Sequence, residues 1–444
     1  MSKKMKILHM MLLSSVLCYN AANADNNIPT YGYVGGDHQQ GDSSPKPVQS
    51  SAANFKSADG LQVKLKAGFD FIAAYHDRSL KSDKPVAQMS PNNDSFVFMS
   101  DANMAVNIEN KTECGLTYGA QIVLETTAKN IKRMASGLYL TSDDFGRLEL
   151  GSDKSPHSKM KINGFSVVVG GVDVWDSWVN IDPDTDKTHA WVLGQSSYID
   201  SKTRTSDKSE FARKISYYTP KFHGFQIGIG YVPDTANGGY GPNNGTDFHT
   251  PVKLPEKEKV DVKNGIAGGI TYEGDIGETT KVKFAVIGEY GKAVARKENA
   301  DKTFTIITDK KFNDLCTWAV GGQVTFDKIS FAAGYYHHGK SLLPEDSKRT
   351  ASGVASVGIG YTFESGYKTN ISYLNSGNKN HSVHAVSWGH EYKLAPGLLP
   401  YGMMTYYNGT RTGGDDGTET NTDGTIKTHK NNGILIAAGI RIEI

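Results

Sequence analysis

Residues 433–444 read GILIAAGIRIEI, and their side chains alternate in character along the chain. Every even position is apolar: Ile434, Ile436, Ala438, Ile440, Ile442 and Ile444. The two charged residues, Arg441 and Glu443, both lie at odd positions. Because successive side chains of a β-strand point to opposite faces, this period of two predicts a strand with one apolar face and one more polar face.

The same alternation recurs along the chain and predicts sixteen strands. They are 61–75, 96–109, 115–127, 135–142, 145–152, 210–218, 224–233, 263–273, 281–290, 315–325, 328–337, 352–363, 366–375, 383–393, 398–408 and 433–443. The count is even, and most lengths are near the ~9–11 residues that a tilted strand needs to cross a membrane. The register of 383–393 is ambiguous, because His384 and His390 share a face with Val386 and Trp388.

The connections between these strands alternate in length. The short ones are 110–114, 143–144, 219–223, 274–280, 326–327, 364–365 and 394–397. Interleaved with them are the long links 76–95, 153–209, 234–262, 291–314, 338–351 and 409–432. Two further interleaved links, 128–134 and 376–382, are of modest length. Short turns at one end and long loops at the other are typical of transmembrane barrels, whereas a soluble sandwich has no reason to sort its loops. The sequence therefore predicts an all-β, antiparallel, up-and-down transmembrane barrel with apolar faces toward lipid and polar faces toward a lumen.

The first 24 residues resemble a secretory signal. Three lysines precede an apolar stretch at 7–18 that is too short to span a bilayer, and Ala22-Asn23-Ala24 fits a cleavage site. A lipoprotein with Cys18 as its lipidated residue is the alternative. We therefore divide the chain into a signal peptide at 1–24, a polar extension at 25–60 and a barrel at 61–444.

Composition narrows the class of protein. A formal net charge of +1 argues against nucleic-acid binding as the main task. No internal apolar run approaches the ~18 residues of a spanning helix. Cys114 and Cys316 would remain after cleavage, and the topology puts them at opposite ends of the barrel, so we expect no disulfide between them.

Three stretches resemble the general porins of Gram-negative bacteria, particularly those of alphaproteobacteria. They are FGRLELG at 145–151, PKFHGFQIG at 220–228 and YVPDT at 231–235. The resemblance implies a 16-stranded barrel, a homotrimer in the outer membrane, and a third loop folded inside the barrel to narrow it. It implies passive diffusion of ions and small hydrophilic solutes. The chain departs from the family in ending at Ile444, where Phe is common, and in starting its first strand late.

The 57-residue link 153–209 is the candidate constriction, because a loop of that length is usually functional. It combines charged residues with apolar Val167-Val168-Val169 and with Trp175 and Trp178, which suit packing against a wall. The candidate constriction residues are Asp173, Asp176, Asp182, Asp184, Asp186, Lys159 and Lys161. The charges predicted to line the lumen wall are Lys64, Lys66, Arg147, Glu149, Lys281, Lys283 and Arg441. An acidic loop facing a basic wall would produce a transverse field, although water in the lumen solvates such charges in any case.

Other chemistry finds little support. Asp182-x-Asp184-x-Asp186 resembles the start of a calcium loop, but Lys187 and Leu193 stand where an EF-hand needs Gly and Glu. His337 and His338 are adjacent, so on a strand they diverge. G-x-S-x-G, H-E-x-x-H and phosphate-loop patterns do not occur. We expect no catalytic residues, no cofactor and no metal. A solute-specific channel, a surface adhesin or antigen with exposed loops, and a soluble β enzyme are the alternatives that the sequence leaves open.

Overall fold

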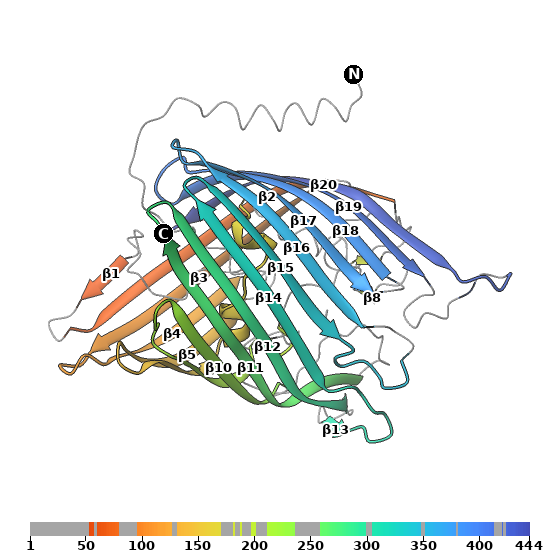
Figure 1. The fold of residues 1–444 in the computed structure, drawn as a ribbon, viewed down its shortest axis with the longest axis horizontal. Coiled ribbons are helices and arrows are strands. Elements are labelled where there is room, and N and C mark those ends of the chain that lie inside the picture. The colour runs from red at the N-terminus through yellow and green to blue at the C-terminus, as the bar shows by residue number, and fades with distance from the viewer. Residues whose placement is uncertain are drawn as a thin grey trace.

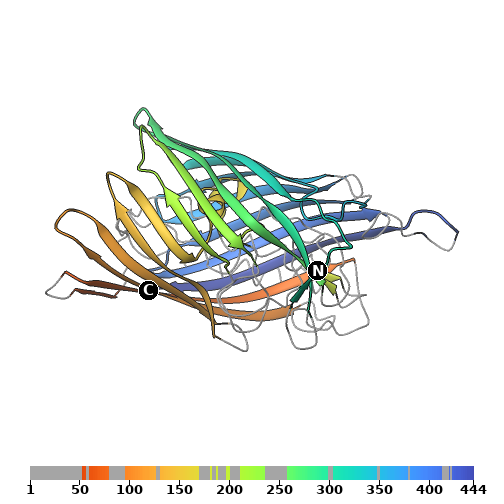
Figure 2. The same ribbon diagram turned by 90° about the horizontal axis from the view of Figure 1, so that it is seen from below.

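Most of the described chain forms one antiparallel sheet. The computed structural model describes residues 53–56, 60–79, 96–126, 131–169, 181–182, 187–188, 197–200, 211–235, 258–298, 304–347, 351–378, 381–412, 420 and 423–444. Figures 1 and 2 show the strands lying side by side and slanting around an enclosed interior. No helix in these ranges is both long enough and apolar enough to cross a membrane.

Sixteen strands close into a barrel. The first eight are β2 (Gln62–Arg78), β3 (Phe96–Lys111), β4 (Thr117–Thr126), β5 (Ile131–Ser142), β6 (Gly146–Ser152), β9 (Arg213–Tyr218), β10 (Phe225–Asp234) and β11 (Glu258–Ile276). The others are β12 (Thr280–Glu298), β14 (Leu315–Phe326), β15 (Ile329–Gly339), β16 (Ser352–Thr362), β17 (Tyr367–Asn378), β18 (His381–Tyr392), β19 (Leu398–Thr412) and β20 (Thr428–Glu443). Each pairs with its neighbour in this order, and β20 pairs with β2, so no edge of the sheet is left open.

All sixteen predicted strands have a counterpart. Most connections on the long-loop side are long, as predicted, but β4 and β5 are separated by only four residues (127–130) and β17 and β18 by only two (379–380). Many strands extend further toward the long-loop end than the sequence pattern does; β12, for example, runs eight residues beyond 290. Two short strands lengthen the sheet locally. β1 (Ala53–Lys56), in the predicted polar extension, pairs with β2, and β13 (Phe304–Ile306) pairs with β12.

The apolar faces of the strands point outward. On β10, Phe225, Ile227 and Ile229 are 51%, 50% and 52% exposed, whereas Gly228 and Gly230 on the opposite face are buried. A soluble protein seldom leaves so much contiguous apolar surface uncovered, so this face suits lipid. The register of β18 is settled in the same way, with Val386 outward and Val383 buried on the inner face.

Aromatic side chains mark the outer face near the strand ends, as expected for interfacial girdles, and Tyr231, Tyr290 and Trp318 are among the exposed ones. Two tyrosines of β19 are exceptions to this pattern. Tyr401 and Tyr407 are buried on the inner face, where Tyr401 donates a hydrogen bond to Asp70. A phenol can satisfy its hydroxyl inside a polar lumen as well as at a membrane interface, so residue type alone did not fix the face.

The chain between β6 and β9 contains the remaining described elements. Helix α2 (Pro156–Lys159) and the 3-10 helix η1 (Gly164–Val167) follow β6 directly. β7 (Ile181–Asp182) and β8 (Lys187–Thr188) form a separate two-stranded pair. The two short helices are drawn inside the barrel in Figure 1, between its front and back walls.

Candidate functional site

The segment 156–169 crosses the inner wall of the barrel strand by strand. Pro156 and Met160 contact β10, and α2 also approaches β11 and β12. Farther along, the backbone N–H of Gly164 donates to Ser356 on β16, and that of Val169 donates to Asn370 on β17. These contacts lie on the face opposite the exposed apolar one, so this part of the chain lies against the interior of the barrel.

Glycines on the inner wall make room for this segment. At Gly321 on β14 a Cβ would stand 1.8 Å from the carbonyl oxygen of Ile162, and at Gly358 on β16 it would stand 2.1 Å from that of Gly164. Gly228 and Gly334 show the same close approach to Met160 and Asn163. Because backbone atoms cannot approach a Cβ this closely, these glycines are what allow the segment to lie flat on the wall.

We therefore expect Gly321→Ala to displace Ile162 from the wall. The added methyl costs about 1–3 kcal/mol of overpacking where backbone must move, and the segment has only the lumen to move into, so single-channel conductance should fall. Gly322→Ala is the matched control, because its Cβ would meet nothing closer than 3.6 Å on the outer face. Equal conductance for the two variants, measured in planar bilayers, would contradict the contact.

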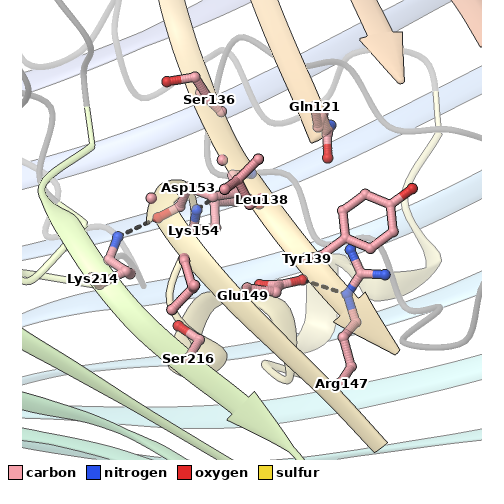
Figure 3. A pocket seen from close by; sticks show the side chains of 14 residues that line it. Gln121, Ser136, Leu138, Tyr139, Arg147, Glu149, Asp153, Lys154, Lys214 and Ser216 are labelled. Carbon is pink, nitrogen blue, oxygen red and sulfur yellow. Dashed lines mark hydrogen bonds and ion pairs between the residues drawn. The ribbon is translucent and has the colours of Figure 1, made fainter. Parts of the chain in front are cut away.

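A chain of charged and aromatic side chains links the wall to the start of this segment, and Figure 3 shows its middle part, Tyr139, Arg147 and Glu149. Lys64 pairs with Glu109 at 2.5 Å, and Tyr139 donates to the other oxygen of Glu109 at 2.8 Å. Arg147 stacks over the Tyr139 ring, 4.2 Å from its centre, and pairs with Glu149 at 2.7 Å.

Lys159 continues this chain into the segment. Its ammonium group lies 2.6 Å from Glu149 and 2.8 Å from Asp153. Burial alone would lower the pKa of Lys159, but the neighbouring carboxylates outweigh it and hold the pKa above its ordinary value. Burial would raise the pKa of Asp153, and the Lys159 ammonium instead holds it below the usual range. Both groups are therefore charged at neutral pH.

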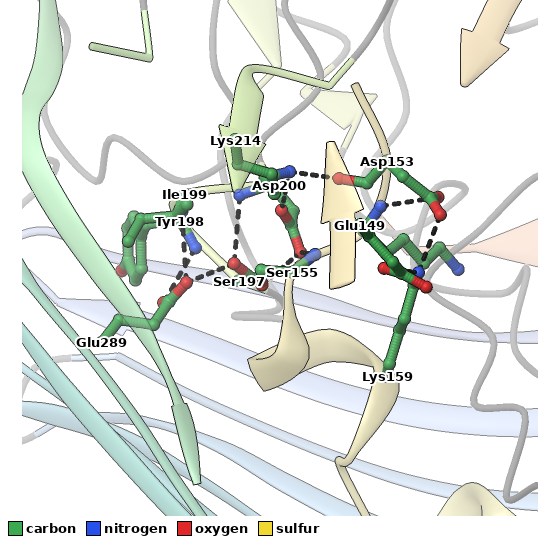
Figure 4. Close-up of polar contacts among 11 residues, drawn as sticks. Glu149, Asp153, Ser155, Lys159, Ser197, Tyr198, Ile199, Asp200, Lys214 and Glu289 are labelled. Atoms are coloured by element: carbon green, nitrogen blue, oxygen red, sulfur yellow. Dashed lines mark hydrogen bonds and ion pairs between the residues drawn. The ribbon is translucent and has the colours of Figure 1, made fainter. Parts of the chain in front are cut away.

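Two described parts of the link 153–209 meet at Asp200 (Figure 4). We call residues 153–169 the outgoing leg and residues 197–200 the returning leg. Ser155 on the outgoing leg donates to Asp200 on the returning leg through its backbone N–H at 2.7 Å and its hydroxyl at 2.6 Å. Lys214 on β9 pairs with Asp200 at 2.7 Å and also donates to the carbonyl oxygen of Asp153. Burial would raise the pKa of Asp200, but Lys214 and Ser155 together hold it below its ordinary value.

The predicted wall residues all lie on inner strand faces. Lys283 pairs with Glu273 at 3.0 Å, and Lys281 shares its face nearer the turn. Arg441 on β20 lies 3.2 Å from Asp70 on β2 and 3.9 Å from Glu391 on β18. It therefore bridges the junction at which the last strand pairs with the first. Lys66 is partly buried and lies close to Lys64 on the same face of β2. The wall therefore carries paired acids and bases rather than basic groups alone.

The structure describes only part of the predicted constriction. Lys159 is ion-paired as above, and Lys161 is buried against the wall. For Asp182 it gives only the backbone, in β7. Asp173, Asp176, Asp184 and Asp186 lie outside the described residues.

Several residues of this site were missed in the sequence. Glu109 could have been found, because strand alternation places it at an inward-facing position of β3. Asp200 carries no such signal, since it lies in an irregular loop. Its pairing with Lys214 depends on a path of the chain that no local pattern encodes.

Histidines and cysteines do not gather into a site. His337 contacts Trp318 outside the barrel, while buried His338 contacts Tyr336 on the inner face, so the two diverge as predicted. Within the described ranges, no three His, Cys, Asp or Glu residues are placed to hold a metal ion. Cys114, in a short turn, and Cys316, at the long-loop end of β14, are both free and exposed.

Comparison with known proteins gives a family and a fold. A family model described as Gram-negative porin matches residues 47–412. An uncharacterized protein of Rickettsia bellii is 29% identical over 388 residues, covering 79% of this chain and 87% of the relative. One from Rickettsia felis is 29% identical over 402 residues, covering 82% and 88%.

Solved structures resemble the chain in fold. A mutant of the Rh. blastica porin superposes with a TM-score of 0.50 at 12% identity, covering 86% of this chain and all of that one. The anion-selective porin from Comamonas acidovorans superposes with a TM-score of 0.49 at 13% identity and the same coverage.

Proposed function

The chain belongs to the Gram-negative porin family, and from that premise we propose that it forms a water-filled channel for the passive diffusion of ions and small hydrophilic solutes. The observation that carries the proposal is the sorting of the two wall faces. Apolar side chains cover the outside, and charged pairs such as Arg147–Glu149 and Arg441–Asp70 face inward. A wall of that kind solvates ions inside and lipid outside.

The segment 153–209 is, in this proposal, the constriction. Its described legs lie on one side of the interior and carry the ion pairs of Lys159 and Asp200. A polypeptide lying inside a barrel reduces the open cross-section, and its charges act at the narrowest point. The candidate acids Asp173, Asp176, Asp182, Asp184 and Asp186 would face the basic wall residues across it and set ion preference.

Location and assembly are further parts of the proposal. The family and the barrel support the outer membrane, and residues 1–24 would direct export and then be removed. A homotrimer is proposed on the family likeness. No step of this function requires a catalytic residue, a cofactor or a metal, because solutes move down their own gradients.

Planar-bilayer recording tests the proposal directly. Protein purified without residues 1–24 should insert as discrete steps whose conductance rises with salt concentration and does not saturate with one sugar or peptide. The reversal potential in a salt gradient reports ion preference. Steps that saturate with a single solute would replace diffusion by a specific channel, and protein that dissolves without detergent and gives no steps would overturn the proposal.

A further inference from the structure

Glu289 on β12 is a buried carboxylate that gathers donors from three parts of the molecule. It is 3% exposed and faces the interior. From the returning leg it accepts the backbone N–H of Tyr198 at 3.0 Å, that of Ile199 at 3.2 Å, and the hydroxyl of Ser197. From the wall it accepts the hydroxyls of Thr317 on β14 and Tyr336 on β15, each at 3.2 Å. Figure 4 shows the carboxylate pointing at the leg.

Apolar packing attaches the same leg to the strands on either side of β12. Ile199 is fully buried and fits against Gly265 on β11, where a Cβ would stand 2.9 Å from its Cδ1 atom. It belongs to an apolar cluster with Val262 and Leu315 on the inner wall. The ring of Tyr198 contacts His338 on β15. Residues 197–199 are thus fixed to four neighbouring strands, β11, β12, β14 and β15, over only three positions.

We propose that Glu289 is a positioning residue that fixes the returning leg of the segment 153–209 to the wall and thereby sets the open bore. The inference rests on the proposed channel function. A carboxylate suits the position because it only accepts hydrogen bonds, and five donors converge on its two oxygens. The barrel wall lies behind the leg, so a released leg can move only into the lumen.

Glu289→Gln tests the role with little change in shape. One carboxylate oxygen receives the Ile199 N–H and the other receives the Tyr198 N–H. Glutamine has one acceptor oxygen and one donor amide group, so either orientation sets an amide against a backbone N–H that cannot turn away. We expect single channels with transient closures and a lower mean conductance, and a smaller solute cut-off, while the circular dichroism of the barrel is unchanged.

Two further variants separate positioning from loss of charge or of folding. Glu391→Gln removes another buried inner-wall carboxylate, whose described ion partners Lys368 and Arg441 belong to the wall, and it should shift ion selectivity without adding closures. Ser197→Ala leaves the wall intact. As a single substitution it should produce closures, but fewer than Glu289→Gln produces. In the Glu289→Gln background it should add fewer closures than in the wild type, because the hydrogen bond to a charged carboxylate is already lost there, although the Ser197 hydroxyl still accepts the Asp200 N–H.

The outcomes distinguish this inference from the function it rests on. If the wild type forms channels and Glu289→Gln channels close no more often than wild-type channels, the inference is overturned and the proposed function stands. Equal closures in Glu289→Gln and Glu391→Gln would also overturn it. Absence of any wild-type conductance would overturn both.

Discussion

Val286→Arg is expected to lower the free energy of unfolding of the barrel by about 2–4 kcal/mol, the cost of an arginine near the middle of a lipid-facing barrel wall. Val286 lies on the outer face of β12, is 46% exposed, and is paired with Ile270 on β11 and Val320 on β14. In lipid the guanidinium group of the introduced arginine would have neither water nor a carboxylate partner. Urea unfolding of the protein refolded in lipid vesicles measures the change.

Gln323→Arg is the matched control for this effect. Gln323 lies on the inner face of β14 and pairs in register with Lys283 on β12, so it stands in the same part of the wall, three residues nearer the short turn than Val286. Arginine there faces a polar interior and should cost about 1 kcal/mol or less. Equal destabilisation of the two variants would contradict the assignment of the two faces. Destabilisation of Gln323→Arg alone would reverse that assignment.

This assignment is also what the sequence predicted best. The period of two depends only on the geometry of an extended chain, and each face meets one uniform medium, so residue type follows the face closely. Strand ends were predicted less well, because at the long-loop end the strands continue past the apolar belt and past the alternating pattern that marked them. β11 starts at Glu258 rather than near 263 for this reason.

Within the segment 153–209, the path of the described residues 156–169 along the wall could not be predicted from the sequence. The length of the segment and its apolar residues indicated packing, but the surface it packs on is built from Gly228, Gly321, Gly334 and Gly358, which lie on four different strands. Each glycine alone resembles an ordinary small residue of a sheet. Only the closed barrel brings the four glycines side by side on the inner wall. The residues that form this contact surface are therefore spread over 131 positions of the sequence, from 228 to 358.

Lys214→Met is the second variant with a large expected effect, because it leaves a buried charge without its partner. The side chains of Lys214 and Asp200 are each only 3% exposed, and removal of one member of such a pair typically costs about 3–5 kcal/mol. The cost falls on docking of the two legs, which meet at Asp200, so the legs should undock while the barrel stays folded. Single-channel recording should show frequent closures at pH 7.

Lys283→Met provides the control for removing a lumen lysine. Its partner Glu273 is 37% exposed at the side chain, and exposed pairs contribute about 1 kcal/mol or less. Lys283→Met should therefore alter ion selectivity and leave the closures at the wild-type frequency. Matching closures in the two variants would mean that Lys214 acts only through its charge in the lumen.

The pH dependence should run in opposite directions in the wild type and in Lys214→Met. In the wild type the pKa of Asp200 lies below its ordinary value, so its contribution to docking is complete above about pH 4 and is lost as the pH falls through the lowered pKa. Wild-type channels should thus be steady at neutral pH and begin to close in acid. Without Lys214, burial dominates and raises the pKa of Asp200 in the docked state.

In Lys214→Met the docked state is therefore penalised at neutral pH, and the penalty disappears as Asp200 becomes protonated. Acidification from pH 7 toward about pH 4 should reduce closures in the variant over a range in which the wild type does not change. Lys214→Met with Asp200→Asn removes the buried charge altogether, and its closures should be independent of pH across that range. Closures that increase with acid in Lys214→Met would show that the carboxylate of Asp200 is not the group that holds the two legs together.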